Sequence, residues 1–459
     1  MEPQMQKFVE ALEKELTAED IDTHIEGCIG CGNCGHACAW YLATNDPKYI
    51  PKTKSDLIRK VYNAYIDPVG KLKASMGLMK KPTVKDLEEM RDAFWSCTTC
   101  GRCSLACMQG VSNRRLTKIG RTCYDAANIL PEIVHQIRTN CRTHQHSFGL
   151  TRDQVFGNVL EKNLIPHGIQ VPIDVEGADY LFLCSAIGNT KIAPEAAHTI
   201  IGTFNAATHL AGFKYTISSK IVDTGTEAMA VVCNPELQKQ YLERIEAEAE
   251  RLRVRAILVP ECACDIRMFL VDSAQILGRN MKYPMDYVDH LFYDWIKSGK
   301  IPVEKLNIKA TYHDPCWTTR LTGYIEEPRE LLKQIIDEKN FIEMTPNREY
   351  NYCCNAGAGP LRMYPSKEGE KNLRQNVSKF KAKQIEATNA DYVLTPCATC
   401  YLSLKDTVKT YGLKTKAEML VDKIYEAMMD ALKKQGKEDL VKLPAYYDKI
   451  PEQFRYIKK

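Results

Sequence analysis

The sequence predicts an α+β multidomain protein, in which a helical N-terminal part precedes two α/β units arranged as a pseudo-repeat. Segments of the first third carry apolar residues at helical spacing, and no strand pattern interrupts them. Beyond residue 170, short apolar runs alternate with helical stretches twice, in the same order. Each time, the last predicted strand runs directly into cysteines, "ECAC" and then "CATC". This coincidence favours an internal repeat.

The predicted elements support a division into four parts. Helices are expected at 5–16, 55–65 and 84–94 in the first part. The first α/β unit has predicted strands at 180–184 and 256–260 and helices at 194–211 and 235–254. The second has predicted strands at 310–314 and 392–396, a helix at 328–337 and a basic helix at 369–387. We therefore predict a helical domain at 1–170, α/β units at 171–303 and 304–410, and a helical, lysine-rich tail at 411–459.

Charge and hydropathy exclude several classes of protein. A net charge of +4 with 26% charged residues does not indicate nucleic-acid binding. The N-terminus lacks a basic segment followed by an apolar one, so no secretory signal is recognised and a cytoplasmic location is expected. The longest uncharged run, 196–212, is short and contains polar residues, which predicts a buried helix and no membrane span. Association with a membrane is expected only through partner subunits.

Eight of the nineteen cysteines form two motifs with the same C-x2-C-x2-C-x3-C spacing. Cytosolic thiols are kept reduced, which favours metal ligation over disulfides. A cubane [4Fe–4S] cluster takes four thiolates, and in duplicated motifs the fourth cysteine ligates the other cluster. We predict one cluster on Cys28, Cys31, Cys34 and Cys107, and a second on Cys38, Cys97, Cys100 and Cys103. The alternative is a pair of structural zinc sites, which such regular triplets fit poorly.

Five further cysteines gather in the second α/β unit: Cys316, Cys353, Cys354, Cys397 and Cys400. Five is one more than a cubane uses, so either one thiol is spare or the centre is not a simple cubane. A vicinal disulfide between Cys353 and Cys354 needs a strained ring and leaves three thiols unassigned. Ligands of open α/β sheets lie beyond the carboxyl ends of the strands, where these cysteines are expected.

The segments "HDPC", "CCNAGAG" and "TPCATC" resemble the three segments of the CCG domain in catalytic subunits of heterodisulfide reductase. A two-cluster ferredoxin-like part ahead of CCG units resembles the layout of the HdrD and DsrK branch. Within it, the chain looks most like the cytoplasmic iron–sulfur subunits of the transmembrane Hmc and Tmc redox complexes. It departs from the pattern at Asn355, where a glycine usually stands, and in a longer gap between Cys354 and Cys397.

The resemblance implies a third [4Fe–4S] centre, cubane or noncubane, held by the five cysteines. In catalytic members such a centre reduces a disulfide or oxidises thiols. His313, three residues before Cys316, is a candidate proton donor, although a single histidine at a strand end is more often a structural hydrogen-bonding residue.

The first α/β unit retains only Cys184, Cys233, Cys262 and Cys264 at the corresponding positions. The cysteine pair has become a single residue and C-x2-C has become C-x-C. This favours loss of the site, and the alternative is that these four thiolates hold an ordinary cubane. Cys123 and Cys141 lie outside every motif and are expected to be structural.

These patterns favour an oxidoreductase subunit that passes electrons through two clusters to or from a thiol/disulfide centre. Expected partners are membrane-integral or cytochrome subunits of a redox complex, with a small thiol or disulfide, free or on a protein, as the substrate. One alternative is an electron conduit without catalysis. Another is the iron–sulfur subunit of a flavin-dependent lactate, glycolate or glycerol-3-phosphate dehydrogenase, although no dinucleotide-binding G-x-G-x-x-G follows a strand here.

Overall fold

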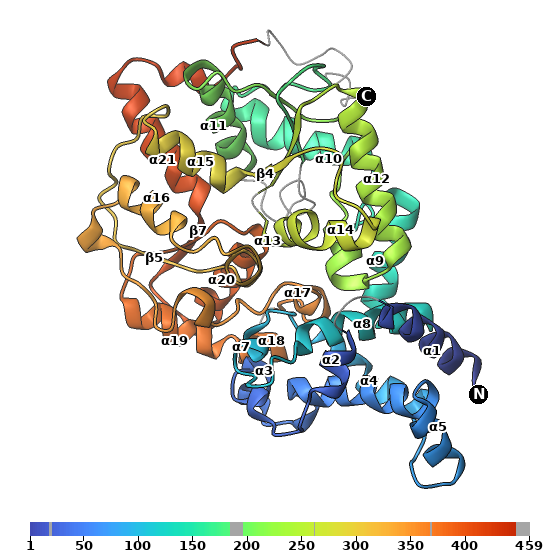
Figure 1. Ribbon diagram of the computed structural model, residues 1–459. Coiled ribbons are helices and arrows are strands. Elements are labelled where there is room, and N and C mark those ends of the chain that lie inside the picture. The colour runs from blue at the N-terminus through green and yellow to red at the C-terminus, as the bar shows by residue number, and fades with distance from the viewer. Residues whose placement is uncertain (18–20, 184–195, 261, 368–369, 447–459) are drawn as a thin grey trace. The chain divides into compact units, whose positions relative to one another are not determined.

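The computed structural model describes residues 1–17, 21–183, 196–260, 262–367 and 370–446 (Figure 1). The chain forms two compact units. Unit 1 consists of Met1–Thr139, Glu227–Glu236 and Tyr352–Lys381, and unit 2 consists of Asn140–Thr226, Leu237–Asn351 and Ala382–Lys459. Two short segments of the predicted α/β units thus belong with the N-terminal helices. The four-part division remains a prediction.

Unit 1 is helical, as the sequence predicted. Its N-terminal helices are α1 (Pro3–Leu16), α2 (Ile21–Glu26), α3 (Ala39–Thr44), α4 (Pro51–Tyr65), α5 (Pro68–Ser75), α6 (Val84–Trp95), α7 (Arg102–Leu105), α8 (Asn113–Ala126) and α9 (Glu132–His144). α17 (Pro360–Met363) and α18 (Leu373–Val377) come from the later segment. Apolar spacing explains the packing, because α1 buries Met5, Phe8 and Leu12 and contacts α8. A capping box between Thr83 and Asp86 fixes the start of α6.

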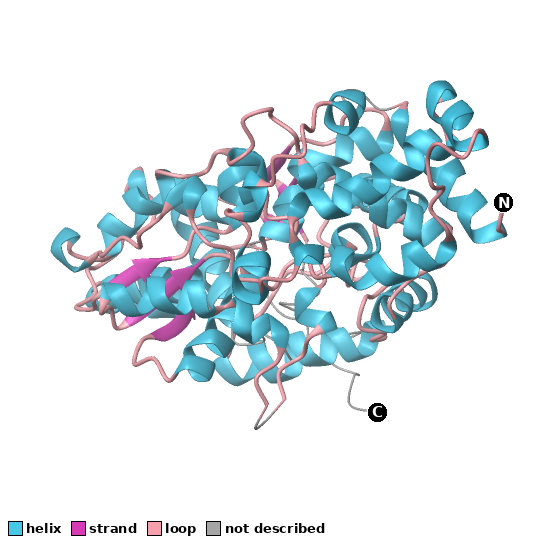
Figure 2. Ribbon diagram, turned by 90° about the horizontal axis from the view of Figure 1, so that it is seen from below, coloured by secondary structure: helices cyan, strands magenta, loops and turns pink. Residues whose placement is uncertain are grey.

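Unit 2 contains two parallel sheets, seen in magenta among cyan helices in Figure 2. The first has the order β2-β1-β3-β4, with β1 (Tyr180–Phe182), β2 (Tyr215–Thr216), β3 (Ala256–Val259) and β4 (Met285–Tyr287). The second has the order β5-β6-β7, with β5 (Ala310–Tyr312), β6 (Tyr392–Thr395) and β7 (Lys416–Met419). Leu181 pairs with Ile257 in one sheet, and Val393 pairs with Ala417 in the other. The predicted α/β alternation is confirmed, whereas the repeat relationship stays a prediction.

Helices cover these sheets and complete the core of unit 2. They are α10 (Arg152–Phe156), α11 (Ala196–Leu210), α12 (Pro235–Arg251), α13 (Ala263–Ile266), α14 (Ser273–Leu277), α15 (Val288–Lys297), α16 (Glu327–Ile335), α19 (Lys379–Thr388), α20 (Ala398–Tyr411) and α21 (Leu420–Lys434). Phe204 of α11, Phe292 of α15 and Ile424 of α21 belong to one apolar cluster with Leu258 and Leu394 of the strands. Central strands of parallel sheets are buried on both faces, which explains their continuous apolar sequences.

Short π-helical and 3-10 segments link these elements. They are Asn33–Gly35, Pro47–Tyr49, Gly157–Leu164, Ile165–His167, Ala228–Val232, Arg267–Asp272, Thr318–Thr322, Glu338–Asn340, Arg348–Tyr350 and Glu438–Val441. Within the described part of the chain, no helix is both long and apolar enough to cross a bilayer. The predicted buried helix near 196–212 is α11, whose residues are mostly buried.

Two predicted elements differ from the structure. Of the basic helix expected at 369–387, residue 369 lies outside the described residues and the rest contains two helices. Asn372 and Gln375 form a capping box at the start of α18, which ends at Val377 with Ser378 as its C-cap, and α19 begins at Lys379. Arg374 and Lys381 are fully buried, so this segment is not a uniformly solvated basic face. The tail expected to be helical from residue 411 contains β7, an edge strand of the second sheet. Its polar, partly exposed sequence carries no apolar run.

Candidate iron–sulfur sites

The first cysteine set lines one cavity of unit 1, here called the outer cavity. Its thiols are Cys28, Cys31, Cys34 and Cys107. Three come from the first motif, whose loop turns at Gly30 and Gly32 with positive φ, and one comes from the second motif. Cys31 is exposed, and so are the neighbouring side chains of Ile29 and Met108. This cavity therefore reaches the surface of the unit.

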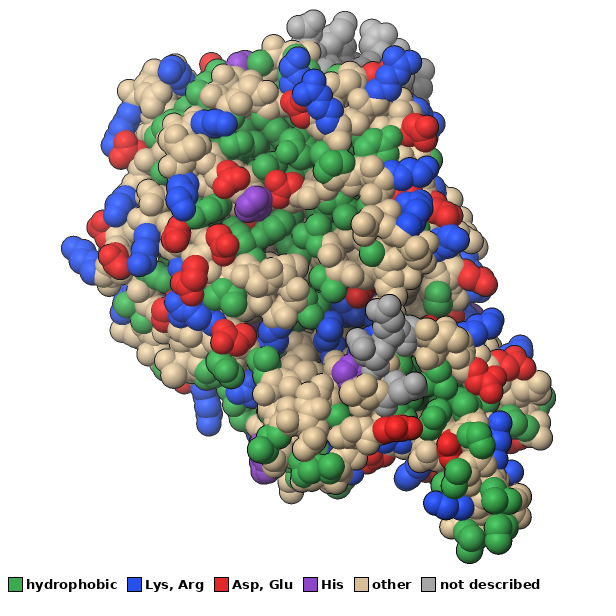
Figure 3. All heavy atoms as spheres, in the orientation of Figure 1, with side chains coloured by type: hydrophobic (Ala, Val, Ile, Leu, Met, Phe, Trp, Pro, Cys, Tyr) green, Lys and Arg blue, Asp and Glu red, His purple; other side chains and the backbone are tan. Residues whose placement is uncertain are grey.

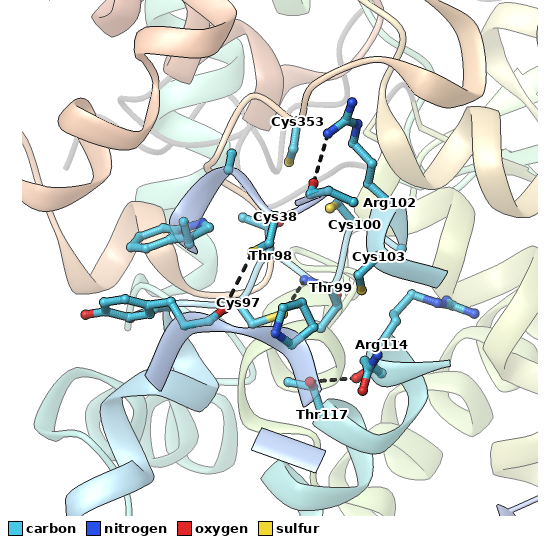
Figure 4. Close-up of a pocket in the computed structure, with 18 of the residues that line it drawn as sticks. Cys38, Cys97, Thr98, Thr99, Cys100, Arg102, Cys103, Arg114, Thr117 and Cys353 are labelled. Carbon is cyan, nitrogen blue, oxygen red and sulfur yellow. Dashed lines mark hydrogen bonds between the residues drawn. The ribbon is translucent and has the colours of Figure 1, made fainter. Parts of the chain in front are cut away.

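The second set lines another cavity of unit 1, here called the inner cavity (Figure 4). Its thiols are Cys38, Cys97, Cys100 and Cys103, joined by Cys353. Each cavity thus combines three thiols of one motif with the fourth thiol of the other, the arrangement expected of two exchanged [4Fe–4S] sites. In both cavities the four thiols of the dicluster motifs fit the ligand set of a cubane.

Burial raises the pKa of two thiols of the inner cavity. It raises the pKa of Cys38 to about 11, and the nearby Lys54 ammonium partly offsets the rise. Burial also raises the pKa of Cys103 well above its usual range, and the neighbouring Cys100, Cys97 and Cys38 add to the effect. Without metal these thiols hold their protons at neutral pH, so iron binding must displace them.

One lysine of α4 lies beside each cavity. Lys54 is buried, lines the inner cavity and interacts with Cys38 and Cys103. Lys52 lines the outer cavity and pairs with Asp56 at 2.6 Å. A positive charge near an iron–sulfur cluster stabilises its reduced form, and the charge of Lys52 is largely neutralised by Asp56. Lys54 should therefore influence the reduction potential of the inner cluster more than Lys52 influences that of the outer cluster.

We expect Lys54→Met to lower the midpoint potential of the inner cluster by about 50 to 100 mV, or roughly 1 to 2 kcal/mol for one electron. Redox titration followed by electron paramagnetic resonance measures the shift. Lys52→Met is the matched control and should leave the inner cluster within about 20 mV of its original potential. An equal shift in the midpoint potential of the inner cluster in both variants would contradict the assignment of the larger influence to Lys54.

Arg102 joins the two motifs to the segment that carries the cysteine pair. Its Nη1 donates a hydrogen bond to the carbonyl of Ala37 at 2.9 Å. Its guanidinium lies 4.0 Å from the ring centroid of Tyr352, the residue before Cys353. Figure 4 shows Arg102 and Cys353 at the same side of the inner cavity. The position of Cys353 beside the inner thiols is thus fixed by contacts within unit 1.

Unit 2 holds the other three cysteines of the predicted third centre. Cys397 follows β6 and is the N-cap of α20, where its sulfur accepts a hydrogen bond from the backbone N–H of Cys400 at 3.4 Å. Both residues are buried, whereas Cys316, which follows β5, is partly exposed. All three lie just beyond the carboxyl ends of parallel strands, as expected from the sequence.

A polar network supports the loop between β5 and Cys316. Asp314 is buried and accepts two hydrogen bonds from Arg329 at 2.8 and 3.0 Å. It also accepts one from the backbone N–H of Arg348 at 2.8 Å. His313 is fully buried, and its Nδ1 lies 3.3 Å from Nδ2 of Asn351. The amide can only donate there, so the neutral ring carries its proton on Nε2.

Sequence reasoning missed Arg329 and Asn351, which lie 15 and 37 residues from Asp314. Neither residue belongs to a motif. The sequence showed only that charged and amide side chains occur together with buried strands. The network supports the loop before Cys316, because Asp314 is paired with Arg329 and the Asn351 amide contacts His313 Nδ1 and the carbonyl of Asp314.

The cysteines of the first α/β unit occupy separate surroundings. Cys233 donates from its thiol to the carbonyl of Met229 at 3.1 Å. Cys262 lies 3.9 Å from Cys397, sulfur to sulfur. Cys184 lies outside the described residues. Cys123 and Cys141 are buried, in keeping with the structural role expected for them.

Models of known protein families match both cysteine-rich regions of the chain. The 4Fe-4S dicluster domain model matches residues 24–111, and the cysteine-rich CCG domain model matches residues 310–405. One subunit of the dihydromethanophenazine:CoB–CoM heterodisulfide reductase of Methanosarcina mazei is 26% identical over 430 residues, 91% of this chain and 96% of that protein. An Hdr-like menaquinol oxidoreductase iron–sulfur subunit of Archaeoglobus fulgidus is 26% identical, covering 77% of this chain and 71% of that protein. The chain is thus similar to heterodisulfide reductase-related CCG-domain iron–sulfur proteins over most of its length.

The structure accounts for the residue at which this chain departs from the CCG pattern. Asn355 has φ of 67°, in the left-handed region that glycine adopts without strain. Asparagine is among the non-glycine residues that best tolerate this conformation. The backbone N–H of Asn355 also donates to Cys353 Sγ at 3.3 Å. Asn355 can therefore preserve the turn that a glycine would make.

Asn355→Gly is expected to retain the fold and the clusters. Asn355→Val should destabilise the turn by about 1 to 2 kcal/mol, because a β-branched residue is strained at positive φ. Thermal unfolding of the anaerobic protein, with iron content measured in parallel, compares the two variants. Equal stability of the glycine and valine variants would contradict the conformational explanation.

Proposed function

We propose that this chain is the electron-transfer subunit that carries electrons through two [4Fe–4S] clusters to or from a CCG centre that exchanges them with a thiol/disulfide couple. The main support is that Cys353 lines the inner cavity together with four cysteines of the dicluster motifs. The CCG match spans all five cysteines of the predicted centre. We assign Cys316, Cys353, Cys354, Cys397 and Cys400 to that centre.

The positions of the cavities support an order for electron transfer. The outer cavity reaches the surface of unit 1 at Cys31, Ile29 and Met108, where a redox partner can approach. The inner cavity contains Cys353, one of the cysteines assigned to the third centre. Electrons would pass between the partner, the outer site, the inner site and the CCG centre in that order, or in reverse.

Reduction of a disulfide breaks one S–S bond, takes up two electrons and two protons, and yields two thiols. When bound, the clusters supply single-electron transfer to a centre where sulfur chemistry takes place. Within the chain, thiols hold the clusters, and His313, with its ring proton on Nε2, is the proposed proton donor. The hydrogen bond to Asn351 fixes this tautomer.

The relatives are named as subunits, which supports assembly with partner proteins. We propose that membrane-integral or cytochrome subunits of an Hmc- or Tmc-type complex are the electron partners, at the cytoplasmic side of the membrane. The substrate class is a small thiol or disulfide, free or carried by a protein.

Electron paramagnetic resonance of the oxidised, anaerobic full chain tests this function. A new signal that appears only when a thiol is added is expected, because substrate sulfur would bind at the third centre. Iron analysis should give about twelve irons per chain. A protein with twelve irons and no thiol-dependent signal would instead be a conduit, and about eight irons would remove the third centre.

A further inference from the structure

A thiol outside the CCG match lies against one of the proposed ligands. Cys262 Sγ is 3.9 Å from Cys397 Sγ, and both residues are 1% exposed. Cys262 follows β3 and precedes α13, just as Cys397 follows β6 and precedes α20. The first α/β unit therefore brings a buried cysteine to the C-x2-C segment of the second.

Thr399, which lies within the sequence Cys397–Cys400, also contacts the C-x-C sequence. Its Oγ1 is 3.5 Å from Cys262 Sγ and 3.8 Å from Cys264 Sγ. Both cysteines of the C-x-C sequence are thus directed at the "CATC" segment. A disulfide between Cys262 and Cys397 would need sulfurs about 2.05 Å apart. Two thiolates bound to one tetrahedral metal, each at about 2.3 Å, lie roughly 3.8 Å apart, close to the observed separation.

We propose that Cys262 is a ligand of the CCG centre and binds the same iron as Cys397. The inference rests on the proposed function, since it requires a cluster on the CCG cysteines. In a cubane with four cysteine ligands each iron carries one thiolate. Two thiolates on one iron therefore imply a centre other than a simple cubane.

Mössbauer spectroscopy of the anaerobic, ⁵⁷Fe-enriched full chain tests the assignment. Cys262→Ser and Cys262→Ala should both change the signal of about one iron among roughly twelve, and leave the eight irons of the two cubanes unchanged. Cys264→Ser is the matched control, and the spectrum should not change. The alanine variant separates iron binding from hydrogen bonding, because serine can still donate a hydrogen bond and alanine cannot.

Two results would overturn the assignment while leaving the proposed function intact. Loss of about four irons in both Cys262 variants, with the third centre unchanged, would show a separate cluster in the first α/β unit. An unaltered spectrum with only a shifted potential would show that Cys262 is a hydrogen-bonding thiol. A wild-type chain with about eight irons would instead overturn the proposed function, and this inference with it.

A second inference rests on an exposed segment of unit 1 that begins with α5, here called the α5 segment (residues 68–85). Its apolar side chains at 59–71% exposure are Val69, Leu72, Met76 and Leu78. Its lysines are all exposed and are Lys71, Lys73, Lys80, Lys81 and Lys85, and no acidic residue falls within it. Figure 3 shows green and blue side chains together at this point, at the lower right.

The base of the α5 segment is closely packed and hydrogen-bonded. Its exposed apolar residues therefore belong to a folded segment. Gly70 is buried against α4, where an added Cβ would lie 1.9 Å from the carbonyl oxygen of Asn63. Tyr65 donates a hydrogen bond to the carbonyl of Pro82 at 2.7 Å, which closes the base. Val69, Leu72 and Met76 follow helical spacing and share one face.

We infer that the α5 segment binds an anionic lipid surface. Lysines complement anionic headgroups, and exposed aliphatic side chains can enter the boundary of the acyl chains. The absence of acidic residues in the sequence of the segment favours this partner over a protein surface of mixed charge. Binding would be direct, in addition to any attachment through partner subunits.

Co-sedimentation of the full chain with vesicles tests this inference. Binding to vesicles containing phosphatidylglycerol is expected, with little binding to pure phosphatidylcholine. Leu72→Ser/Met76→Ser should weaken it about tenfold or more, whereas Ile165→Ser, at another exposed apolar position, should not. Absent binding, or equal binding by the double variant, would overturn the inference. So would a requirement for Leu72 and Met76 in binding to a partner protein but not to vesicles.

Discussion

Cys353→Ser is expected to reduce thiol/disulfide turnover on the order of a hundredfold or more, while both dicluster signals persist. Cys353 is buried and lines the inner cavity, and its sulfur accepts the N–H of Asn355. Serine offers a hydroxyl that is far less acidic than a thiol and binds iron poorly in this position. Loss of the ligand should disrupt the proposed third centre without disturbing the four thiols of the inner site.

Anaerobic turnover with a thiol substrate, together with electron paramagnetic resonance of the reduced protein, measures both effects. Cys123→Ser is the matched control, since Cys123 is a fully buried cysteine of α8 outside every motif. It should lower stability and leave turnover per folded molecule unchanged. Full turnover by the Cys353 variant would contradict a catalytic CCG centre and favour a simple conduit.

The cysteine spacing predicted more of the site than any other feature of the sequence. Each cavity of unit 1 contains the four thiols grouped by the exchanged motif pattern. Such a pattern is informative because cluster ligation restricts both the number of thiols and the length of the loop between them. The presence of a cluster in each cavity remains part of the proposal.

Strands with apolar, buried residues were predictable, and strands with polar or exposed residues were not. β1, β3, β5 and β6 have apolar sequences, and most of their residues are buried. β4 and β7 are edge strands with mainly half-buried or exposed residues, so their sequences carry little strand signal. For this reason β7 was missed in the predicted helical tail, which also contains α21 (Leu420–Lys434).

Contacts between distant segments could not be predicted from the sequence. The separation between Cys262 and Cys397 is 135 residues, and no local pattern indicates that their sulfurs meet. Nor does the position of Cys353 at the inner cavity follow from its spacing to Cys103. These placements depend on the packing of whole elements, which periodicity does not encode.

A buried arginine, Arg121, holds several distant segments of unit 1 together. Its replacement is the second change for which we expect a large effect. Arg121 of α8 is fully buried and donates hydrogen bonds to backbone carbonyls from three separate segments of unit 1. The acceptors are Phe94 at 2.7 Å, Cys97 at 2.6 Å, Ala230 at 2.8 Å and Ala358 at 2.7 Å. One of them belongs to an inner-cavity cysteine, and another follows the cysteine pair.

The neighbouring contacts leave little room for compensation. Trp95 Nε1 donates to the carbonyl of Val231 at 2.8 Å. Gly359, with φ of 123°, approaches so closely that an added Cβ would lie 3.2 Å from the carbonyl oxygen of Trp95. Water cannot readily replace the guanidinium in such a site, so the four carbonyls would lose their donor.

Arg121→Met should therefore destabilise unit 1 by about 3 to 5 kcal/mol. Hydrogen–deuterium exchange should accelerate at 94–97, 228–232 and 356–359 together, because one side chain holds all three segments. Arg91→Met, at a partly exposed position that pairs with Asp92, is the control and should change stability by less than about 0.5 kcal/mol. Faster exchange in only one segment would show that the three are held independently. Coordinated loosening would establish Arg121 as the link between the dicluster motifs and the loop that carries Cys353.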